Sequence, residues 1–370
     1  MNESNYDSGC IYDIAVIGAG PSGSNFSRLV DSIKYKVVLI DGENEEHKKP
    51  CGGLLSPDAQ DIMARYNITL PSYILVSPQI FSVRTIDLES GLIRHYRRSY
   101  INMDRYKFDR FLLGMVPQSV SRIEGRCISI LKEDKYYLLE IKSREQTPVT
   151  IKAKNIVGAD GASSVVRRTF FKKSTIQRYT AVQQWFYSAD ANPFYSCVFD
   201  SSTSESCSWV FFKDGFLVFG GAFKPSGCRI AFEEQKRKLI NMGILPGDIE
   251  NGLVRTESCS VLRPHLCKGF CLGKNGVYLM GEAAGFISPS SLEGISGALL
   301  SSEKLADAFN SGMDNSIYRR YKSGTFCLKG RLKLKCIKRP FMYNKKLRTI
   351  IMKSGILSIN IRESAVKTVK

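Results

Sequence analysis

The sequence predicts an α/β protein with a β-α-β unit near its N-terminus and a smaller, mostly antiparallel β part further along the chain. Ile11 to Ile17 is a short run rich in Val and Ile and bounded by glycine, which is typical of a buried parallel strand. A glycine-rich turn and a helical segment follow, and Lys36 to Ile40 is a second apolar run. The aromatic segment 209–219 indicates a hairpin that turns at Asp214-Gly215.

Length and composition are those of an ordinary globular protein. With 370 residues, of which 43% are apolar and 24% charged, the chain has room for about two domains and is not a disordered protein. No run approaches the ~18 apolar residues of a membrane span, and the N-terminus lacks the basic region of a secretory signal. Eleven cysteines are too sparse for a disulfide scaffold and show no zinc spacing, so we expect a cytoplasmic protein without a metal site.

The net charge of +18 is concentrated at the C-terminus, because residues 311–370 contain 16 Lys and Arg against 2 Asp and Glu. Such a basic tail indicates an anionic partner, unless it is simply a set of solvated helices. Nucleic acid is not expected, because no recognition module accompanies the charge. Apolar residues follow helical spacing and basic residues fall opposite them: Tyr343, Leu347, Ile350, Ile351 and Leu357 against Lys345, Lys346, Arg348 and Lys353. This pattern fits a helix on an anionic membrane surface and equally a helix packed on the domain core.

The turn after the first strand reads G-x-G-x-x-G, with glycines at positions 18, 20 and 23. Gly18 permits a tight turn, Gly20 lets the backbone approach a diphosphate, and Gly23 lets the helix pack close to the strand. Free N–H groups around Ser22 and the helix dipole favour the diphosphate. Asp41 follows the second strand, 18 residues past Gly23, where it is able to accept from an adenosine ribose. These features together predict a Rossmann-like dinucleotide site, without distinguishing FAD from NAD.

Two later segments also pass from a strand end into a helix. Val157-Gly-Ala-Asp160-Gly161 follows several strand-like stretches, and Val277-Tyr-Leu-Met-Gly281-Glu282 is again a short apolar strand with an acid after it. An acid at such a strand end is able to accept from a ribityl hydroxyl. A helix predicted to open at Gly294 and Ile295 would direct its backbone N–H groups at the pyrimidine edge of a flavin, where a reduced ring carries negative charge.

Together the three segments resemble the FAD-dependent oxidoreductases of the para-hydroxybenzoate-hydroxylase-like fold, whose hallmarks are an N-terminal GxGxxG, a central ADG and a C-terminal GDAA. The last reads GEAA here, with Glu282 in place of Asp. The segment KPCGGLLSP at 49–57 resembles the PCGG segment of the geranylgeranyl reductase family. Arg105 and Asp109 fit that family's R-x3-D-x2-L helix near the cofactor. The resemblance covers residues 11 to 310 and leaves the basic tail unmatched.

This resemblance implies hydride transfer from reduced flavin to an alkene of an isoprenoid or other apolar substrate. It places Cys51 beside the flavin ring, which Gly52 and Gly53 would admit. The thiol is then either a proton donor or a small packing group. No second G-x-G-x-x-G is present, so NAD(P)H would bind transiently, or a ferredoxin-like carrier would supply the electrons.

The aromatic stretch from Thr180 to Phe223 contains the region where reductases of this family often show YxWxFP. Here Cys207, Trp209, Phe211 and Phe212 occupy those positions, so the Tyr and the Pro are missing. The segment fits an apolar wall facing a substrate, as the family implies, and about equally a core sheet.

Two other functions remain open at this point. The same fold hosts flavin monooxygenases that hydroxylate aromatic compounds, and fold alone does not fix the reaction. The other alternative is an FAD-binding resistance or stress protein with little turnover, peripheral at the inner face of the membrane.

The predicted domain division is an FAD domain from 1–70, 100–175 and 263–310, a substrate domain from 71–99 and 176–262, and a helical tail over 311–370. The oligomeric state is not predicted.

Overall fold

The computed structural model describes residues 9–42, 50–143, 147–173, 176–188, 194–265, 269–312 and 316–359. The chain divides into two compact units, each made of three segments. Unit 1 comprises 1–75, 103–181 and 258–338, and unit 2 comprises 76–102, 182–257 and 339–370. These boundaries lie a few residues from the predicted ones. The predicted tail, however, does not form a unit of its own, because it is divided between units 1 and 2 after Lys338.

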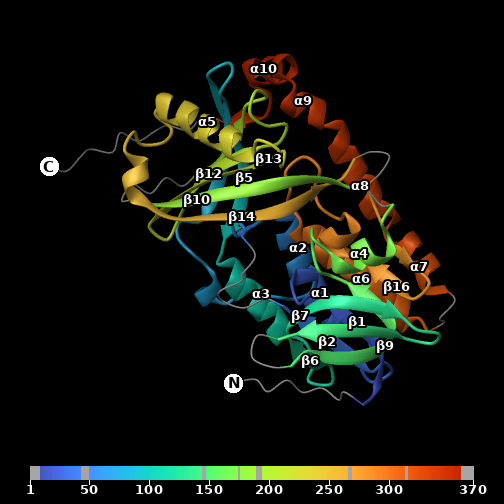
Figure 1. Ribbon diagram of the computed structural model, residues 1–370. Coiled ribbons are helices and arrows are strands. Elements are labelled where there is room, and N and C mark those ends of the chain that lie inside the picture. Colours follow the sequence, from blue (N-terminus) through green and yellow to red (C-terminus); the bar gives the residue numbers. More distant parts are fainter. Residues whose placement is uncertain are drawn as a thin grey trace. The chain divides into compact units, whose positions relative to one another are not determined.

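A parallel, Rossmann-like sheet forms the centre of unit 1 (Figure 1). β1 lies between β9 and β2 and runs parallel to both, with Val16 opposite Val157 on one side and Leu39 on the other. The strand order is β15-β16-β9-β1-β2-β6, and β8 joins β7 to β9 in an antiparallel meander. The strands are β1 Ile11–Ile17, β2 Val37–Asp41, β6 Ser121–Glu124, β7 Arg126–Lys132, β8 Tyr137–Lys142, β9 Val149–Gly158, β15 Gly273–Lys274 and β16 Val277–Leu279.

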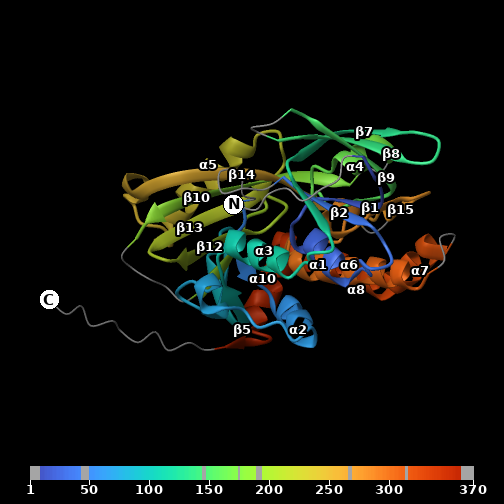
Figure 2. The same cartoon turned by 90° about the horizontal axis from the view of Figure 1, so that it is seen from below.

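Helices cover one face of this sheet, and the β7–β8 hairpin lies on the other (Figure 2). α1 packs against α6 and α3, while α4 packs on β7 and β9. The remaining elements of unit 1 are α1 Pro21–Leu29, β3 Leu54–Leu55, α2 Pro57–Arg65, η2 Ser72–Ile74, α3 Arg105–Gly114, α4 Val165–Phe170, η4 Gly281–Ala284, α6 Ile295–Asn310, α7 Ile317–Gly324 and α8 Phe326–Ile337.

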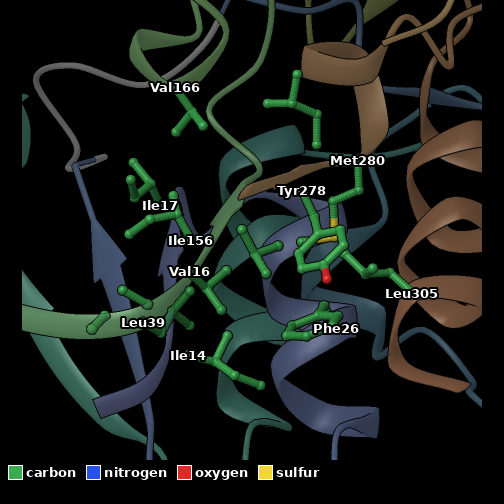
Figure 3. Close-up of a cluster of buried hydrophobic side chains, with 14 of the residues drawn as sticks. Ile14, Val16, Ile17, Phe26, Leu39, Ile156, Val166, Tyr278, Met280 and Leu305 are labelled. Carbon is green, nitrogen blue, oxygen red and sulfur yellow. The ribbon is translucent and has the colours of Figure 1, made fainter. Parts of the chain in front are cut away.

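The main hydrophobic core of unit 1 lies between this sheet and α1 and α6 (Figure 3). Phe26 of α1 and Tyr278 of β16 both make edge contacts with Phe309 of α6, with ring centroids 5.7 and 5.4 Å apart. Because both faces of the central strands are covered, β1 and β2 are almost continuously apolar rather than alternating. Each fully buried large side chain stabilises the fold by about 2 kcal/mol.

Unit 2 is built on a mostly antiparallel sheet. The predicted hairpin is confirmed: β12 and β13 pair across a two-residue turn in which Asp214 and Gly215 have φ values of 47° and 78°. Two consecutive positive φ values are the mark of the tight turn that matches strand twist. α5 packs on β13 through Phe232, which stacks on Phe219 at 4.7 Å. Its elements are β4 Ile80–Asp87, β5 Leu92–Asn102, β11 Phe194–Phe199, β12 Ser208–Lys213, β13 Phe216–Phe223, α5 Cys228–Asn241, η3 Ile249–Gly252, α9 Arg339–Tyr343, α10 Lys345–Ser354 and β17 Ser358–Ile359. Two long strands, β10 Gln177–Tyr187 and β14 Leu253–Arg263, have residues in both units.

The C-terminal helices are attached by buried contacts. In unit 1 the Tyr321 hydroxyl of α7 donates to the Leu279 carbonyl at 2.8 Å. In unit 2 Arg348 of α10 donates to Asp87 at 2.7 Å and to Glu89 at 2.6 Å. Arg348, which helical spacing groups with Lys345, Lys346 and Lys353, is buried in an ion-pair network. Within the described ranges, no helix has the length and apolar character that a membrane span requires.

Candidate functional site

The glycine-rich loop joins β1 to α1, and its three glycines have different surroundings. A Cβ on Gly18 would lie 2.7 Å from the Ala159 carbonyl oxygen, and one on Gly23 would lie 1.8 Å from the Gly18 carbonyl oxygen. A Cβ on Gly20 would meet nothing within 4 Å. The first and third glycines are therefore required by packing inside the protein, whereas the second borders open space at a helix N-terminus. This is the cradle that a diphosphate needs.

Helix α1 and the GEAA turn are held together at this loop. A Cβ on Gly281 would lie 2.7 Å from the Ser22 hydroxyl oxygen, so the buried Ser22 side chain is directed at the turn. The Gly281 N–H donates to the hydroxyl of Ser301 in α6 at 2.9 Å. Asn25 of α1 donates to the hydroxyl of Ser302 in α6, also at 2.9 Å. The first and third sequence motifs, although more than 250 residues apart, thus form one site.

Asp160 lies beside Gly18 at the end of β9. Its Oδ2 accepts from the N–H groups of Val165 and Val166 at 2.6 and 3.3 Å and so caps α4. Its Oδ1 is buried and has no hydrogen-bond partner among the described residues. Burial raises the pKa of this carboxyl group, partly offset by hydrogen bonds from Ser164 and the α4 backbone. A ligand hydroxyl would satisfy this oxygen, as the predicted cofactor contact requires.

Glu282 projects from η4, and its Oε1 accepts from the Leu262 N–H of β14 at 2.9 Å. This bond sets the direction of the longer side chain that replaces the usual Asp. A ribityl contact from Glu282 remains a prediction.

Sequence reasoning missed Arg167, which ties the second and third motifs together. Its guanidinium is buried and donates to the carbonyls of Ala283 at 2.7 Å and Ala162 at 2.5 Å. Burial lowers its pKa, which remains that of a strong base. In the sequence nothing distinguishes Arg167 from the exposed Arg168 next to it.

Asp41 ends β2 as predicted, and Arg110 of α3 binds both of its carboxylate oxygens, at 2.5 and 3.3 Å. Arg110 also borders a cavity of about 520 Å³ in unit 1. The lining contains three aromatic rings, two cations, one acid and two other residues: Tyr73, Asp104, Tyr106, Lys107, Arg110, Phe111, Gly114 and Met115. The sequence motif did not reveal the cation that pairs with Asp41, and contact of this cavity with an adenosine remains a prediction.

Arg105, expected near the cofactor, donates within α3 to Asp109 at 2.8 Å. This i,i+4 pair supports the first turns of the helix. A direct cofactor contact from Arg105 stays a prediction.

Hydrogen bonds within unit 1 hold both ends of the PCGG segment, residues 50–53. Lys49, the first residue of the longer segment noted in the sequence, lies outside the described residues. The Met103 N–H donates to the Gly53 carbonyl at 2.8 Å, and the Cys259 thiol contacts the Pro50 carbonyl at 3.6 Å. The Gly53 N–H donates to the Cys51 sulfur at 3.5 Å. Gly53 has a φ of 69°, a conformation that favours glycine. Gly52 completes the segment, and its role toward a flavin ring is untested.

α6 begins at Ile295 with Gly294 as its N-cap, as predicted. The loop before it contains Leu292 at a φ of 58°, which costs about 1 kcal/mol or more in a non-glycine residue. The fully buried Arg263 of β14 holds this loop by donating to the Pro289 carbonyl at 2.9 Å, and it also donates to the Tyr179 hydroxyl at 3.2 Å. Arg263 is a second buried cation that the sequence motifs did not indicate.

Taken together, the residues fit FAD. The open space at Gly20 suits a diphosphate, and the orphaned Asp160 oxygen suits a ribityl hydroxyl. No cluster of metal-ligating side chains occurs in the described part of the chain.

Comparisons with known proteins identify the family and the fold. No protein-family model matches the chain. Protein CbrA of Escherichia coli O6:H1 is 40% identical to this chain over 358 residues, and the alignment covers 94% of each protein. Protein CbrA of Shigella dysenteriae is 39% identical over 354 residues, which cover 94% of this chain and 98% of that protein.

Among solved structures, the geranylgeranyl bacteriochlorophyll reductase-like protein of Thermoplasma acidophilum has a TM-score of 0.77 at 19% identity, covering 96% of this chain and 93% of that one. PqsL of Pseudomonas aeruginosa in complex with 2-aminobenzoylacetate has a TM-score of 0.68 at 14% identity, covering 93% and 100%. The predicted fold is thereby confirmed. The chain has the geranylgeranyl reductase-like fold of FAD-dependent oxidoreductases and belongs to the CbrA family.

Proposed function

We propose that the protein is an FAD-dependent oxidoreductase that reduces C=C bonds of an isoprenoid or other apolar substrate. The main support for FAD binding is that three motifs far apart in the sequence lie together around the open space at Gly20. The Asp160 oxygen for which the described residues offer no hydrogen-bond partner lies beside them. The likeness to a geranylgeranyl bacteriochlorophyll reductase-like protein supports reduction over other flavin chemistry, although it shows the fold alone.

Each group in unit 1 has a proposed task toward the cofactor. The N-terminus of α1, with Gly20 and Ser22, binds the diphosphate. Asp41 accepts from the adenosine ribose while Arg110 holds its carboxylate in place. Asp160 and Glu282 accept from the ribityl hydroxyls. The N-terminus of α6 at Gly294 and Ile295 stabilises negative charge at the pyrimidine edge.

When bound and reduced by NAD(P)H or a ferredoxin-like carrier, FAD supplies the hydride for the alkene. The chain must then supply a proton to the neighbouring carbon, and we assign this task to Cys51. The Gly53 N–H donates to its sulfur at 3.5 Å and so helps to orient the side chain. A general acid of this kind contributes about 10² to 10⁴ in rate.

The proposed substrate class rests on unit 2. Val210 and Phe212 of β12 belong to the core around Phe232, so the alternating Trp209 and Phe211 face the opposite side of the sheet. On that side the ring centroid of Phe211 lies 6.1 Å from that of Tyr195, and the ring centroid of Tyr195 lies 5.3 Å from that of Tyr100. Phe211 and Tyr100 are buried, whereas Trp209 and Tyr195 are partly exposed, so these two rings are the ones we propose to contact an apolar chain.

The purified protein tests the proposal directly. Its visible spectrum is expected to show bound flavin, and the anaerobically reduced protein is expected to be reoxidised by a prenyl lipid. A colourless protein that stays colourless after incubation with excess FAD would refute cofactor binding.

Two further outcomes decide between the remaining functions. Oxygen consumed in proportion to a hydroxylated product would identify a monooxygenase instead. Bound FAD that no prenyl lipid or quinone reoxidises would favour a resistance or stress protein with little turnover.

A further inference from the structure

Helix α10 is attached to unit 2 by its polar side rather than by its apolar one. Arg348 and Met352, four residues apart, are the buried side chains of this helix. Arg348 is anchored by Asp87 and Glu89, and Arg94 donates to the Met352 carbonyl at 2.9 Å. The face of the helix that is packed on the protein is therefore not the apolar stripe noted in the sequence.

The apolar stripe of α10 is exposed. Leu347, Ile350 and Ile351 share one face at i, i+3 and i+4 spacing, roughly 120° around the helix from the Arg348–Met352 face. All three are exposed, and Ile350 exposes 64% of its surface. Beyond the end of the helix, Ile356 and Leu357 are exposed as well, with Leu357 84% exposed.

This apolar surface is ordered and has a basic border. Gly355 caps α10 in the left-handed conformation, and Ser358 and Ile359 then pair with β5 opposite Tyr96 and His95. Between positions 339 and 359 the sequence contains five Lys and Arg and no Asp or Glu. Lys346 and Lys353 are exposed beside the stripe.

We propose that this surface, formed by Leu347, Ile350, Ile351, Ile356 and Leu357 with Lys346 and Lys353, binds the headgroup region of an anionic phospholipid membrane. Charge complementarity favours this partner, because branched apolar side chains flanked by Lys346 and Lys353 match the acyl boundary below phosphate headgroups. A second copy of the chain would bring the same cations face to face, which opposes self-association. The proposal concerns unit 2 alone and is independent of the flavin chemistry.

Sedimentation of the full-length protein with phosphatidylglycerol vesicles and with phosphatidylcholine vesicles tests the proposal. Binding is expected to the anionic vesicles at low salt and to weaken at ~1 M salt, where the Debye length is about 3 Å. Ile350→Glu is expected to lower the partition coefficient at least about tenfold, since it removes apolar burial and adds a repelled charge. Lys353→Glu is expected to lower it at least about fivefold, from loss of one cation near the surface.

α5 of unit 2 offers matched controls, because Ile230 is 75% exposed and Arg229 beside it is exposed as well. Ile230→Glu and Arg229→Glu introduce the same changes on a helix outside the proposed surface and are expected to leave vesicle binding unchanged. All four side chains are exposed, so the variants should fold, which circular dichroism checks.

Three results would overturn the proposal. One is failure of the wild-type protein to bind anionic vesicles at low salt. Another is an equal loss in the α5 controls, which would indicate attraction by net charge alone. A third is a dimer, seen by sedimentation velocity, that Ile350→Glu dissociates while vesicle binding persists, which would assign the surface to a second copy of the chain.

Discussion

Substitution of Gly20 by Asp separates what the glycine-rich loop does for the fold from what it does for the cofactor. Gly20 is the N-cap of α1, with φ −70° and ψ −172°, which any L-residue adopts without strain. A Cβ at this position meets nothing within 4 Å. Asp is among the preferred N-cap residues and its charge complements the helix dipole. The free energy of unfolding of the FAD-free protein is therefore expected to stay the same or rise by about 0.5–1 kcal/mol.

The same change is expected to weaken FAD binding strongly. It removes one charge-assisted hydrogen bond between the loop and the diphosphate, worth about 1.5–3 kcal/mol. It also places two negative charges about 4 Å apart, which costs about 1 kcal/mol in water and about 4 kcal/mol at the effective dielectric constant of a protein surface. The smaller values together predict at least about a fiftyfold increase in the Kd of FAD.

Two control variants belong to this experiment. Gly20→Asn is nearly isosteric with Asp and also a good N-cap, so the difference in FAD affinity between Asn and Asp isolates the charge. Gly23→Ala places a Cβ 1.8 Å from the Gly18 carbonyl oxygen, and the required shift of α1 is expected to cost about 2–3 kcal/mol of stability. Chemical denaturation measures stability, and quenching of FAD fluorescence measures affinity.

Two results would refute the reasoning. If Gly20→Asp bound FAD as tightly as the wild type, the diphosphate would not lie at this helix N-terminus. If Gly20→Asp and Gly23→Ala destabilised the FAD-free protein equally, the open space at Gly20 would not exist.

Three further predictions concern other parts of the molecule. Cys51→Ala is expected to retain FAD and lose about 10²-fold in turnover, and full turnover would show that the thiol has no chemical role. Asp160→Asn is expected to gain stability relative to the wild type in the FAD-free protein as the pH rises above about 4, the ordinary pKa of Asp, and denaturation series at several pH values measure this gain. Burial raises the pKa of Asp160, so the wild type loses stability in that range, whereas Asn carries no charge to bury. Arg348→Met is expected to cost about 3–5 kcal/mol in denaturation, because Asp87 is left buried without its cation. Burial raises the pKa of Asp87, but hydrogen bonds from Arg348 and Ser90 outweigh this effect and hold the pKa below its usual value. The stability that this ion pair gives the wild type is therefore expected to be lost only at acidic pH, as the pH falls through that lowered pKa. A loss of this stability already near neutral pH would contradict the prediction.

The cofactor cradle was largely predictable from sequence. Glycine spacing, apolar runs and an acid at a strand end act over a few residues, so Gly18 and Gly20 were placed correctly between β1 and α1, and Gly23 in the first turn of α1. The hairpin at Asp214-Gly215 was predictable for the same reason, since two residues with positive φ determine that turn.

The arginines around the site were not predictable. Arg110, Arg167 and Arg263 act through backbone carbonyls or through a carboxylate far away in the sequence, and no spacing rule marks such partners. Arg167 and Arg168 are identical neighbours, yet one is buried and the other exposed.

By itself the sequence determined the β-α-β unit, the three cofactor motifs and the basic character of the C-terminus, because each depends on local residue pattern or composition. Only the tertiary structure decided which face of α10 is exposed. The periodicity of that helix specifies two faces, but the choice between them is made by Asp87 and Glu89, 261 and 259 residues from Arg348. The buried Asp87, with the partly exposed Glu89 beside it, needs a cation more than an apolar side chain needs to be covered, so the face with Arg348 packs inward and the apolar face is exposed.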